Sequence, residues 1–270
     1  MTTYGRFACV ERSIMMWLLQ DFEGPSELIV YNTDAEYPLV KDSTLLDKNI
    51  ITINNNIDMI TQEEYTNVGA IRRDAVSFAT GEYYICWDDD DIFLPWNNRQ
   101  CMDGILRHPD AKAFKPMYSL FETPAKLEQA RNTLEASIIV HLQTIREIGF
   151  RMENGSEHLD WYTKLSYGGQ MIEDEYSIPG YSYRWNDPDI AGHKQSGRMG
   201  AEDGFTEHKN ASQDRATRPL TLQTDQSILH PYYEYFRSNI DGKTSTPNIP
   251  PTYPPNFHPE LIDKYVRQYL

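Results

Sequence analysis

Four consecutive aspartates, Asp88 to Asp91, are the most chemically suggestive residues of the sequence. They follow an apolar, aromatic-rich stretch and precede Pro95, so they lie between an expected strand and an expected helix. Adjacent carboxylates repel one another, which is costly beside a core unless a cation or N–H donors compensate. Mg²⁺ or Mn²⁺ suits such oxygen ligands, and ligands bind at the carboxyl ends of strands in open α/β sheets. The run therefore indicates a metal or ligand site, with a solvated acidic turn as the plain alternative.

The segments around the aspartates alternate between helical and extended patterns. The clearest helix spans residues 67–80, with Asn67 as its N-cap and Gly81 at its end, and a strand spans residues 82–87. Alternation of this kind predicts an α/β sheet with crossover helices. The other expected helices cover residues 10–21, 95–108 and 156–165, the last capped by Ser156, and the other strands cover residues 27–32, 48–53, 111–121 and 135–141.

The composition changes after about residue 200. Residues 246–259 contain six prolines among fourteen residues, which predicts an extended, polyproline-like arm. A short helix over residues 260–270 is expected to close the chain. This tail is expected to pack on the main domain or on a partner, so a homo-oligomer formed through the tail is one option.

Composition and charge exclude several classes of protein. The chain has 270 residues, and 25 Lys and Arg against 40 Asp and Glu give a net charge of −15, which argues against a general binder of nucleic-acid backbones. With 40% apolar residues, a fully disordered chain is excluded. Three cysteines are too few for a disulfide framework. No window approaches the ~20 apolar residues of a membrane span, so we expect a soluble, cytoplasmic protein.

Three stretches in fixed order carry a resemblance to a known family: residues 67–73 (NVGAIRR), 79–85 (ATGEYYI) and 87–95 (WDDDDIFLP). Together they resemble the central block of GT-A fold glycosyltransferases, most closely the large inverting family that contains cellulose, chitin and chondroitin synthases. Residues 3–6 (TYGR) and 156–165 (SEHLDWYTKL) are similar to further motifs of that family. The resemblance covers roughly residues 1–185. It implies an α/β fold of the GT-A, Rossmann-like type, with a mixed sheet flanked by helices and a Pro-rich C-terminal extension.

The resemblance implies a metal-dependent glycosyltransferase that moves a sugar from a nucleotide-sugar, with a UDP-sugar favoured, to an acceptor hydroxyl with inversion. The cofactor would be Mn²⁺ or Mg²⁺, acting as a Lewis acid on the departing diphosphate. In the D-x-D register, Asp88 is expected near the ribose, Asp89 beside the donor and Asp90 on the metal. Residues 1–115 would form the nucleotide-sugar-binding half, residues 116–200 the acceptor-binding and catalytic half, and residues 201–270 the extension.

Further donor contacts are implied near the N-terminus and on the 67–80 helix. Thr3 and Tyr4 belong to the TYGR motif, and the Tyr4 ring would stack on the nucleobase unless it is plain core. Asp34 would accept an N–H of the base. Arg6 and Arg72 would meet ribose or diphosphate oxygens, although Arg72 would equally suit the solvated face of its helix.

The resemblance implies the catalytic base less directly. The family's base is the aspartate of a Glu-Asp pair, and in this sequence His158 stands in place of that aspartate. Glu157 and Asp160 are the remaining carboxylates, and they share one face at a helix start. We expect Asp160 to be the base, with Glu157 close behind. His158 is the third option, since a histidine titrates near neutral pH.

Two further features follow from the comparison with the family. His193 lies in the stretch 187–200, where a late histidine completes the metal shell in several GT-A enzymes; a plain exposed loop histidine is the alternative. At the start of the chain, Gly5 replaces an asparagine. Only Met1 and Thr2 precede Thr3, so either the sheet lacks most of a central strand or the recorded start lies downstream of the true one.

Two other classes compete with a glycosyltransferase. A nucleotidyltransferase would carry a Gly-rich, basic phosphate loop after the first strand, which this sequence lacks. A non-catalytic Ca²⁺ or carbohydrate-binding module would use Asp88 to Asp91 for Ca²⁺, but the alternating ligands of an EF-hand are missing. The acceptor stays open between a small molecule, a glycan, a protein and a modified nucleic acid.

Overall fold

The computed structural model of the chain describes residues 1–4, 7–36, 38–39, 49–123, 126–132, 135–174 and 179–184. The expected Pro-rich arm and closing helix lie outside these residues, and so does the stretch 187–200. Among the described residues, no helix is long and apolar enough to cross a membrane.

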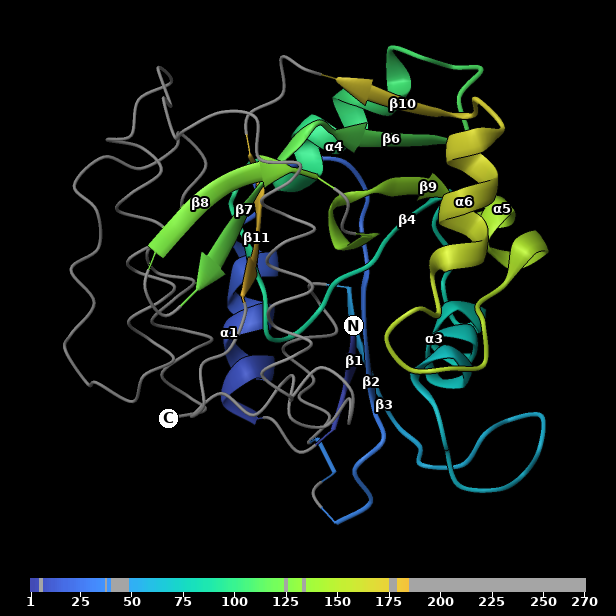
Figure 1. Cartoon of the computed structure of the whole chain (residues 1–270). Helices are drawn as coiled ribbons and strands as arrows, with labels where there is room; N and C mark the ends of the chain where they lie inside the picture. The colour runs from blue at the N-terminus through green and yellow to red at the C-terminus, as the bar shows by residue number, and fades with distance from the viewer. Residues whose placement is uncertain are drawn as a thin grey trace, which may run out of the picture.

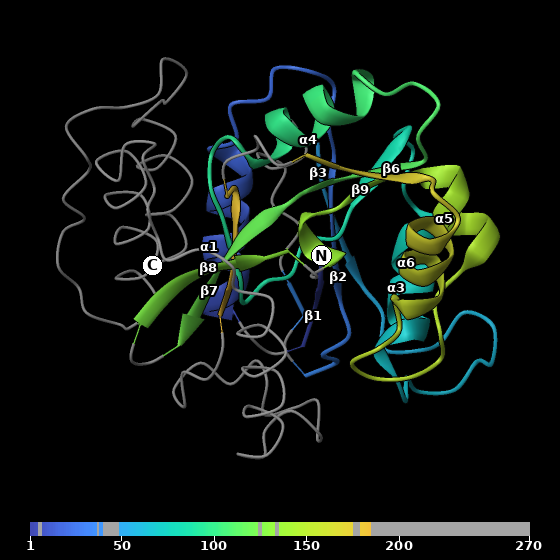
Figure 2. The same cartoon turned by 45° about the horizontal axis from the view of Figure 1, so that its top comes forward.

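Three parallel strands form the first sheet, in the order β1 (Thr2–Thr3), β2 (Leu28–Asn32), β3 (Ile50–Asn54). Helices α1 (Phe7–Leu18) and α3 (Val68–Ser77) lie on opposite sides of this sheet in both views (Figures 1 and 2). The sheet is held between apolar layers because the strands are rich in Leu, Ile and Val, several of which are buried. This layering is the α/β arrangement that the alternating pattern predicts.

Helix α3 begins as the sequence indicates and is set close to the rest of the fold. The Asn67 side chain caps it by accepting a hydrogen bond from the Ala70 backbone N–H at 2.9 Å. A Cβ at Gly69 would lie 1.7 Å from the Arg151 carbonyl oxygen, so only glycine permits this approach. The Gly69 N–H donates to the Glu153 carbonyl at 3.3 Å. The helix is thereby fixed against the loop that leads into α6 (Leu159–Tyr167).

The second sheet is mixed, with the order β10 (Met171–Asp174), β6 (Ala113–Pro116), β9 (Ile139–His141), β4 (Tyr83–Ile85). Helix α5 (Leu142–Ile148) packs on β4, β9 and α6, and α4 (Asn97–Leu106) packs on β6 and β9. A third sheet has the order β5 (Ile92–Phe93), β11 (Tyr181–Arg184), β7 (Tyr118–Thr123), β8 (Lys126–Arg131). The expected mixed sheet flanked by helices is therefore present, divided into three parts.

Several element boundaries differ from those expected. The single strand over residues 111–121 is two strands, β6 and β7, because Pro116 has no N–H with which to extend a ladder. The strand over residues 135–141 is a 3-10 turn, η1 (Glu135–Ser137), followed by β9. Ser156 does not cap α6; its hydroxyl donates to the Glu153 carboxylate at 2.9 Å, and the helix begins after His158. Helix α1 starts at residue 7, α3 ends at Ser77, and β5, β8 and α5 are additional elements.

Aromatic packing ties the strand-to-helix region after β4 to α1. The Trp87 ring stacks on Phe93 with 3.9 Å between ring centroids, and its indole N–H donates to the Ser13 hydroxyl at 2.8 Å. All of these side chains are buried. The segment between Trp87 and Phe93, which contains the four aspartates, is therefore anchored at both ends.

A cavity of about 410 Å³ lies beside the short strand β1. Its walls come from β2 and β4, and Arg72 and Asp88 are among its lining residues. The Met1 α-ammonium donates to the Ile29 carbonyl at 2.8 Å, and burial lowers its pKa. One edge of the first sheet is thus a two-residue strand next to a largely apolar cavity.

Candidate active site

The four aspartates occupy the turn between β4 and β5, at the carboxyl end of β4. Asp89 and Asp91 are buried, while Asp88 and Asp90 are partly exposed. The Asp91 carboxylate accepts a hydrogen bond from the Tyr181 hydroxyl, which fits a supporting role in the loop. From α1, the buried Arg12 donates to the Asp89 carbonyl at 2.9 Å. The turn is therefore held from two sides, and Asp88 and Asp90 are its more accessible aspartates.

Arg72 is the centre of a buried ion-pair network. It lies on the inner face of α3, where the neighbouring small residues Gly69 and Ala75 allow close packing. Its Nη2 lies 2.9 Å from Asp88 Oδ1, and its Nε lies 3.0 Å from Glu157 Oε1. The side chain is only 9% exposed. The alternative of a solvated Arg72 is therefore excluded, because three segments of the chain close over its guanidinium.

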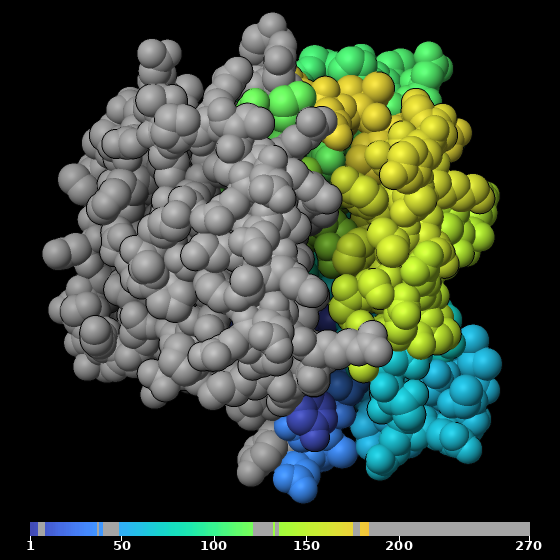
Figure 3. All heavy atoms as spheres, in the orientation of Figure 1, coloured from blue at the N-terminus to red at the C-terminus, as the bar shows by residue number. Residues whose placement is uncertain are grey.

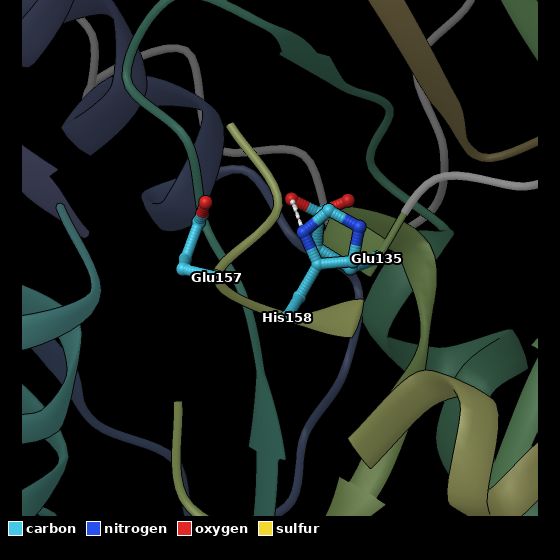
Figure 4. A group of neighbouring side chains, drawn as sticks. All are labelled: Glu135, Glu157 and His158. Atoms are coloured by element: carbon cyan, nitrogen blue, oxygen red, sulfur yellow. Dashed lines mark ion pairs between the residues drawn. The ribbon is translucent and has the colours of Figure 1, made fainter. Parts of the chain in front are cut away.

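Glu135, Glu157 and His158 complete this network (Figure 4). Glu135 begins the η1 turn, and the other two residues immediately precede α6. His158 Nδ1 lies 3.1 Å from Glu135 Oε1, and Arg72 Nη1 lies 3.9 Å from that same oxygen. Oε2 of Glu157 is buried and has no hydrogen-bond partner among the residues that the structure describes.

The network shifts the pKa values of its members in directions that follow from burial and charge. Burial alone would raise the pKa of Glu135, but the charge and hydrogen bonding of His158, with Arg72, lower it to about 2. Burial lowers the pKa of His158, but the Glu135 carboxylate outweighs this effect and the pKa is raised. Burial raises the pKa of Asp88, and Arg72 opposes that shift only in part.

The network carries more negative than positive charge. Asp88, Glu135 and Glu157 contribute three carboxylates against the Arg72 guanidinium and the His158 ring. The excess remains negative in either charge state of the histidine. A cation bound beside Asp88 and Asp90 would therefore be electrostatically favoured.

Glu135, Glu157 and His158 also form a group of possible metal ligands, whose ligating atoms lie within 4.8 Å of one another. The Arg72 guanidinium already contacts the same Glu157 and Glu135 oxygens, at 3.0 and 3.9 Å. A divalent ion placed among them would face this fixed cation at close range. We therefore interpret the group as part of the ion-pair network, and the partly exposed Asp90 stays the predicted metal ligand.

The residues expected to bind the nucleoside lie at the ends of β1 and β2. Tyr4 is 52% exposed, so it is available for stacking and is not part of the core. Asp34 is buried, and its carboxylate accepts a hydrogen bond from the Glu36 N–H at 2.9 Å. Thr3 is buried, and within the described part of the chain its hydroxyl has no hydrogen-bond partner. Their roles toward a nucleotide stay predictions.

The structure separates the two carboxylates proposed as the base. Glu157 is buried in the network, whereas the Asp160 side chain is 48% exposed and lies 2.5 Å from Arg151 Nε. Figure 3 shows α5 and α6 (yellow) on the surface next to the cyan residues around α3. Arg6 and His193 lie outside the described residues.

Glu135 and Arg12 are the site residues that the sequence did not indicate. Glu135 belongs to no motif of the resemblance, and only the η1 turn brings it to His158. Arg12 lies inside an apolar helical pattern. A buried arginine needs a hydrogen-bond acceptor. The place of Arg12 within the apolar pattern was therefore the one signal in the sequence that could have indicated it.

Comparisons with known proteins agree at the level of the fold. No family model matches the chain, and no curated protein matches it. TarS 1–349 of S. aureus in complex with UDP is similar in structure, with a TM-score of 0.52 and 14% identity over 88% of this chain and 78% of that chain. The complex of TarS 1–349 with UDP-GlcNAc also has a TM-score of 0.52, at 14% identity, over 89% and 87% of the two chains.

Glucosyl-3-phosphoglycerate synthase from Mycobacterium tuberculosis, in complex with Mn²⁺, UDP and glucosyl-3-phosphoglycerate, is similar with a TM-score of 0.50 and 12% identity. The similarity covers 82% of this chain and 79% of that chain. Together with the parallel sheet, the mixed sheet and the aspartate turn after β4, these similarities identify the chain as a protein with the GT-A fold.

Proposed function

We propose that the protein is a metal-dependent glycosyltransferase that transfers a sugar from a nucleotide-sugar to an acceptor hydroxyl with inversion. The observation that carries this proposal is the aspartate turn at the carboxyl end of β4, with Arg72 and Glu157 behind it. A charged, partly buried turn at this edge of an α/β sheet is where such folds bind ligands. The similar structures contain UDP, UDP-GlcNAc and Mn²⁺ with UDP, which supports a UDP-sugar as the donor.

In this proposal Asp88 and Asp89 contact the donor, and Asp90 binds Mn²⁺ or Mg²⁺, with His193 as a second ligand. When bound, the metal supplies Lewis-acid stabilisation of the negative charge on the leaving diphosphate. Tyr4 stacks on the base, while Thr3, Asp34 and Arg6 contribute to nucleoside and phosphate binding. Arg72 acts by fixing Asp88, because its guanidinium is already occupied by carboxylates.

The division of the chain is part of the same proposal. Residues 1–115 bind the nucleotide-sugar, residues 116–200 bind the acceptor and complete the catalytic site, and the tail from residue 201 is an extension. For the base, Asp160 and Glu157 were expected from the sequence. Both have arginine partners, so each carboxylate is already engaged in an ion pair.

A donor-hydrolysis screen tests the proposal. The protein is incubated with UDP- and GDP-sugars in Mn²⁺, Mg²⁺ or EDTA, and release of the nucleoside diphosphate is measured. We expect metal-stimulated release that Asp90→Ala abolishes and Asp103→Ala preserves, because Asp103 is an exposed residue of α4. Release of pyrophosphate from nucleoside triphosphates instead would contradict the proposal and indicate a nucleotidyltransferase. No metal-dependent release from any donor would also contradict it.

A further inference from the structure

His158 and Glu135 form a close, largely buried ion pair between two separate segments of the chain. The distance from His158 Nδ1 to Glu135 Oε1 is 3.1 Å, and the two residues come from separate elements, η1 and the start of α6. The Glu135 side chain is 14% exposed, and the His158 side chain is 19% exposed. A carboxylate this close to Nδ1 favours a proton on that nitrogen and leaves Nε2 as the acceptor of a further proton.

We propose that His158 is the catalytic base of sugar transfer and that Glu135 is its positioning residue. This inference rests on the proposed function and adds to it the identity of the base. In Figure 4 the dashed line joins the His158 ring to Glu135, and Glu157 stands beside the pair with its carboxylate separate from it. The residue that was the least expected base is therefore the one whose surroundings suit the role.

The proposed step is a single displacement at the anomeric carbon. The acceptor hydroxyl gives its proton to His158 Nε2, and its oxygen forms the new bond to the anomeric carbon. The bond between that carbon and the diphosphate oxygen breaks, and its electron pair leaves on the nucleoside diphosphate. The imidazolium that results is stabilised by the Glu135 carboxylate, and it later loses the proton to water.

The other candidates are less suited because each carboxylate is already paired with an arginine. Glu157 Oε1 lies 3.0 Å from Arg72 Nε inside the fold. Asp160 lies 2.5 Å from Arg151 Nε on an exposed surface. Each of these carboxylates is therefore already engaged by a guanidinium. His158, by contrast, has a partner that raises its proton affinity.

The charged groups around His158 determine its titration. Glu135 faces it from η1 and Glu157 from the preceding position, and both favour the imidazolium; Arg72 from α3 opposes it. The Trp161 ring of α6 lies 6.3 Å away between ring centroids and adds no charge. The N-terminus of α6 carries a positive partial charge and also opposes the imidazolium. The net direction is a raised pKa of His158, so Glu135 is the decisive partner.

The experiment compares His158→Asn and Glu135→Gln in the full chain by donor turnover as a function of pH. Asparagine keeps an N–H toward Glu135 but cannot act as the base, so we expect turnover to fall by about 10²-fold or more while UDP still binds. Glutamine keeps a hydrogen-bonding oxygen but loses the charge. We therefore expect the acidic limb of kcat/KM to move down by about 1 pH unit or more. The matched controls are His108→Asn and Glu147→Gln, both at exposed positions.

An NMR titration of the His158 ring supplies a readout that does not depend on turnover. We expect its pKa to lie above the ordinary value of 6.5 in the wild-type protein and to fall in Glu135→Gln. An unchanged pKa, or an unchanged acidic limb, would overturn the role of Glu135. Turnover in His158→Asn equal to that of the wild type would overturn the assignment of His158 as the base and leave the proposed function standing. A wild-type protein that consumes no nucleotide-sugar would overturn both.

Discussion

Replacing Arg72 by methionine tests whether the buried network is organised as described. Methionine keeps much of the length of the side chain and removes its charge and donors. Asp88 and Glu157 then lose cationic partners at 2.9 and 3.0 Å. Both carboxylates stay where burial disfavours their charged form. The substitution therefore leaves negative charge uncompensated at the centre of the site.

The expected loss of stability follows from the burial of the pair. Removing one partner of a buried ion pair costs about 3–5 kcal/mol. Because the Asp88 side chain is 21% exposed, water relieves part of this cost, and we expect about 3 kcal/mol. For a domain of this size each kcal/mol lowers the melting temperature by about 2–4 °C. The expected decrease is therefore roughly 6–12 °C at neutral pH.

The pH dependence of this loss has a definite sign. In the wild-type fold Glu135 has a pKa of about 2 against an ordinary 4.5, so its carboxylate stabilises the fold above pH 4.5 and this contribution is lost as the pH falls toward 2. Asp88 has a raised pKa, so its charge already destabilises the fold at neutral pH. Removing Arg72 raises the pKa of both carboxylates, because its positive charge favours their ionised forms. The cost of Arg72→Met is therefore largest near pH 7 and decreases as the carboxylates become protonated below it.

Urea unfolding at pH 7.5 and pH 5 measures this difference. Arg99→Met is the matched control, since Arg99 lies 2.8 Å from Asp21 but is 50% exposed, and exposed pairs contribute about 0–1 kcal/mol. We expect the Arg72 variant to lose much more stability than the control at pH 7.5 and to approach it at pH 5. Equal losses in both variants at pH 7.5, or a loss that grows toward pH 5, would refute the reasoning.

Three further outcomes are expected. Asp90→Ala removes Mn²⁺-stimulated donor turnover without lowering the melting temperature of the metal-free protein, because it relieves repulsion among Asp88 to Asp91; unchanged turnover at saturating Mn²⁺ would contradict the metal assignment. Asp160→Asn lowers turnover by less than His158→Asn does, measured in the same donor assay, because Asp160 is exposed and paired; a larger loss at Asp160 would restore it as the base. Gly69→Ala destabilises the protein by about 1–3 kcal/mol, since its Cβ would meet a backbone oxygen at 1.7 Å, and a melting temperature equal to that of the wild type would contradict the close contact.

The sequence predicted the features that depend on local signals. The Asn67 cap, the strand after Gly81 and the position of the aspartate turn are each set by residues within a few positions of one another, and the structure confirms them. The division of residues 111–121 into two strands was also accessible, because Pro116 marks the point where pairing ends. In each of these cases the residue types within a short segment restrict the backbone conformation of that segment.

The rest depends on contacts between distant segments. The sequence gives no indication that Glu135 meets His158, because the pair forms only when η1 and the start of α6 come together. Ser156 was expected to cap α6, but a nearer acceptor, Glu153, takes its hydroxyl. Arg72 could be solvated or buried on sequence grounds alone, and the packing of Gly69 against the Arg151 carbonyl decides the outcome. Tertiary packing overrides local preference at each of these positions.

The Arg72 network also has a consequence for how the protein folds. Its members come from α3, from the turn after β4, from η1 and from the start of α6, so Arg72 and Glu157 are separated by about half of the described chain. Contacts between such distant segments carry a large loop-closure entropy and tend to form late. Interactions absent from the transition state act on the rate of unfolding rather than on the rate of folding. We therefore expect the Arg72 network to slow unfolding and so to lengthen the lifetime of the native state.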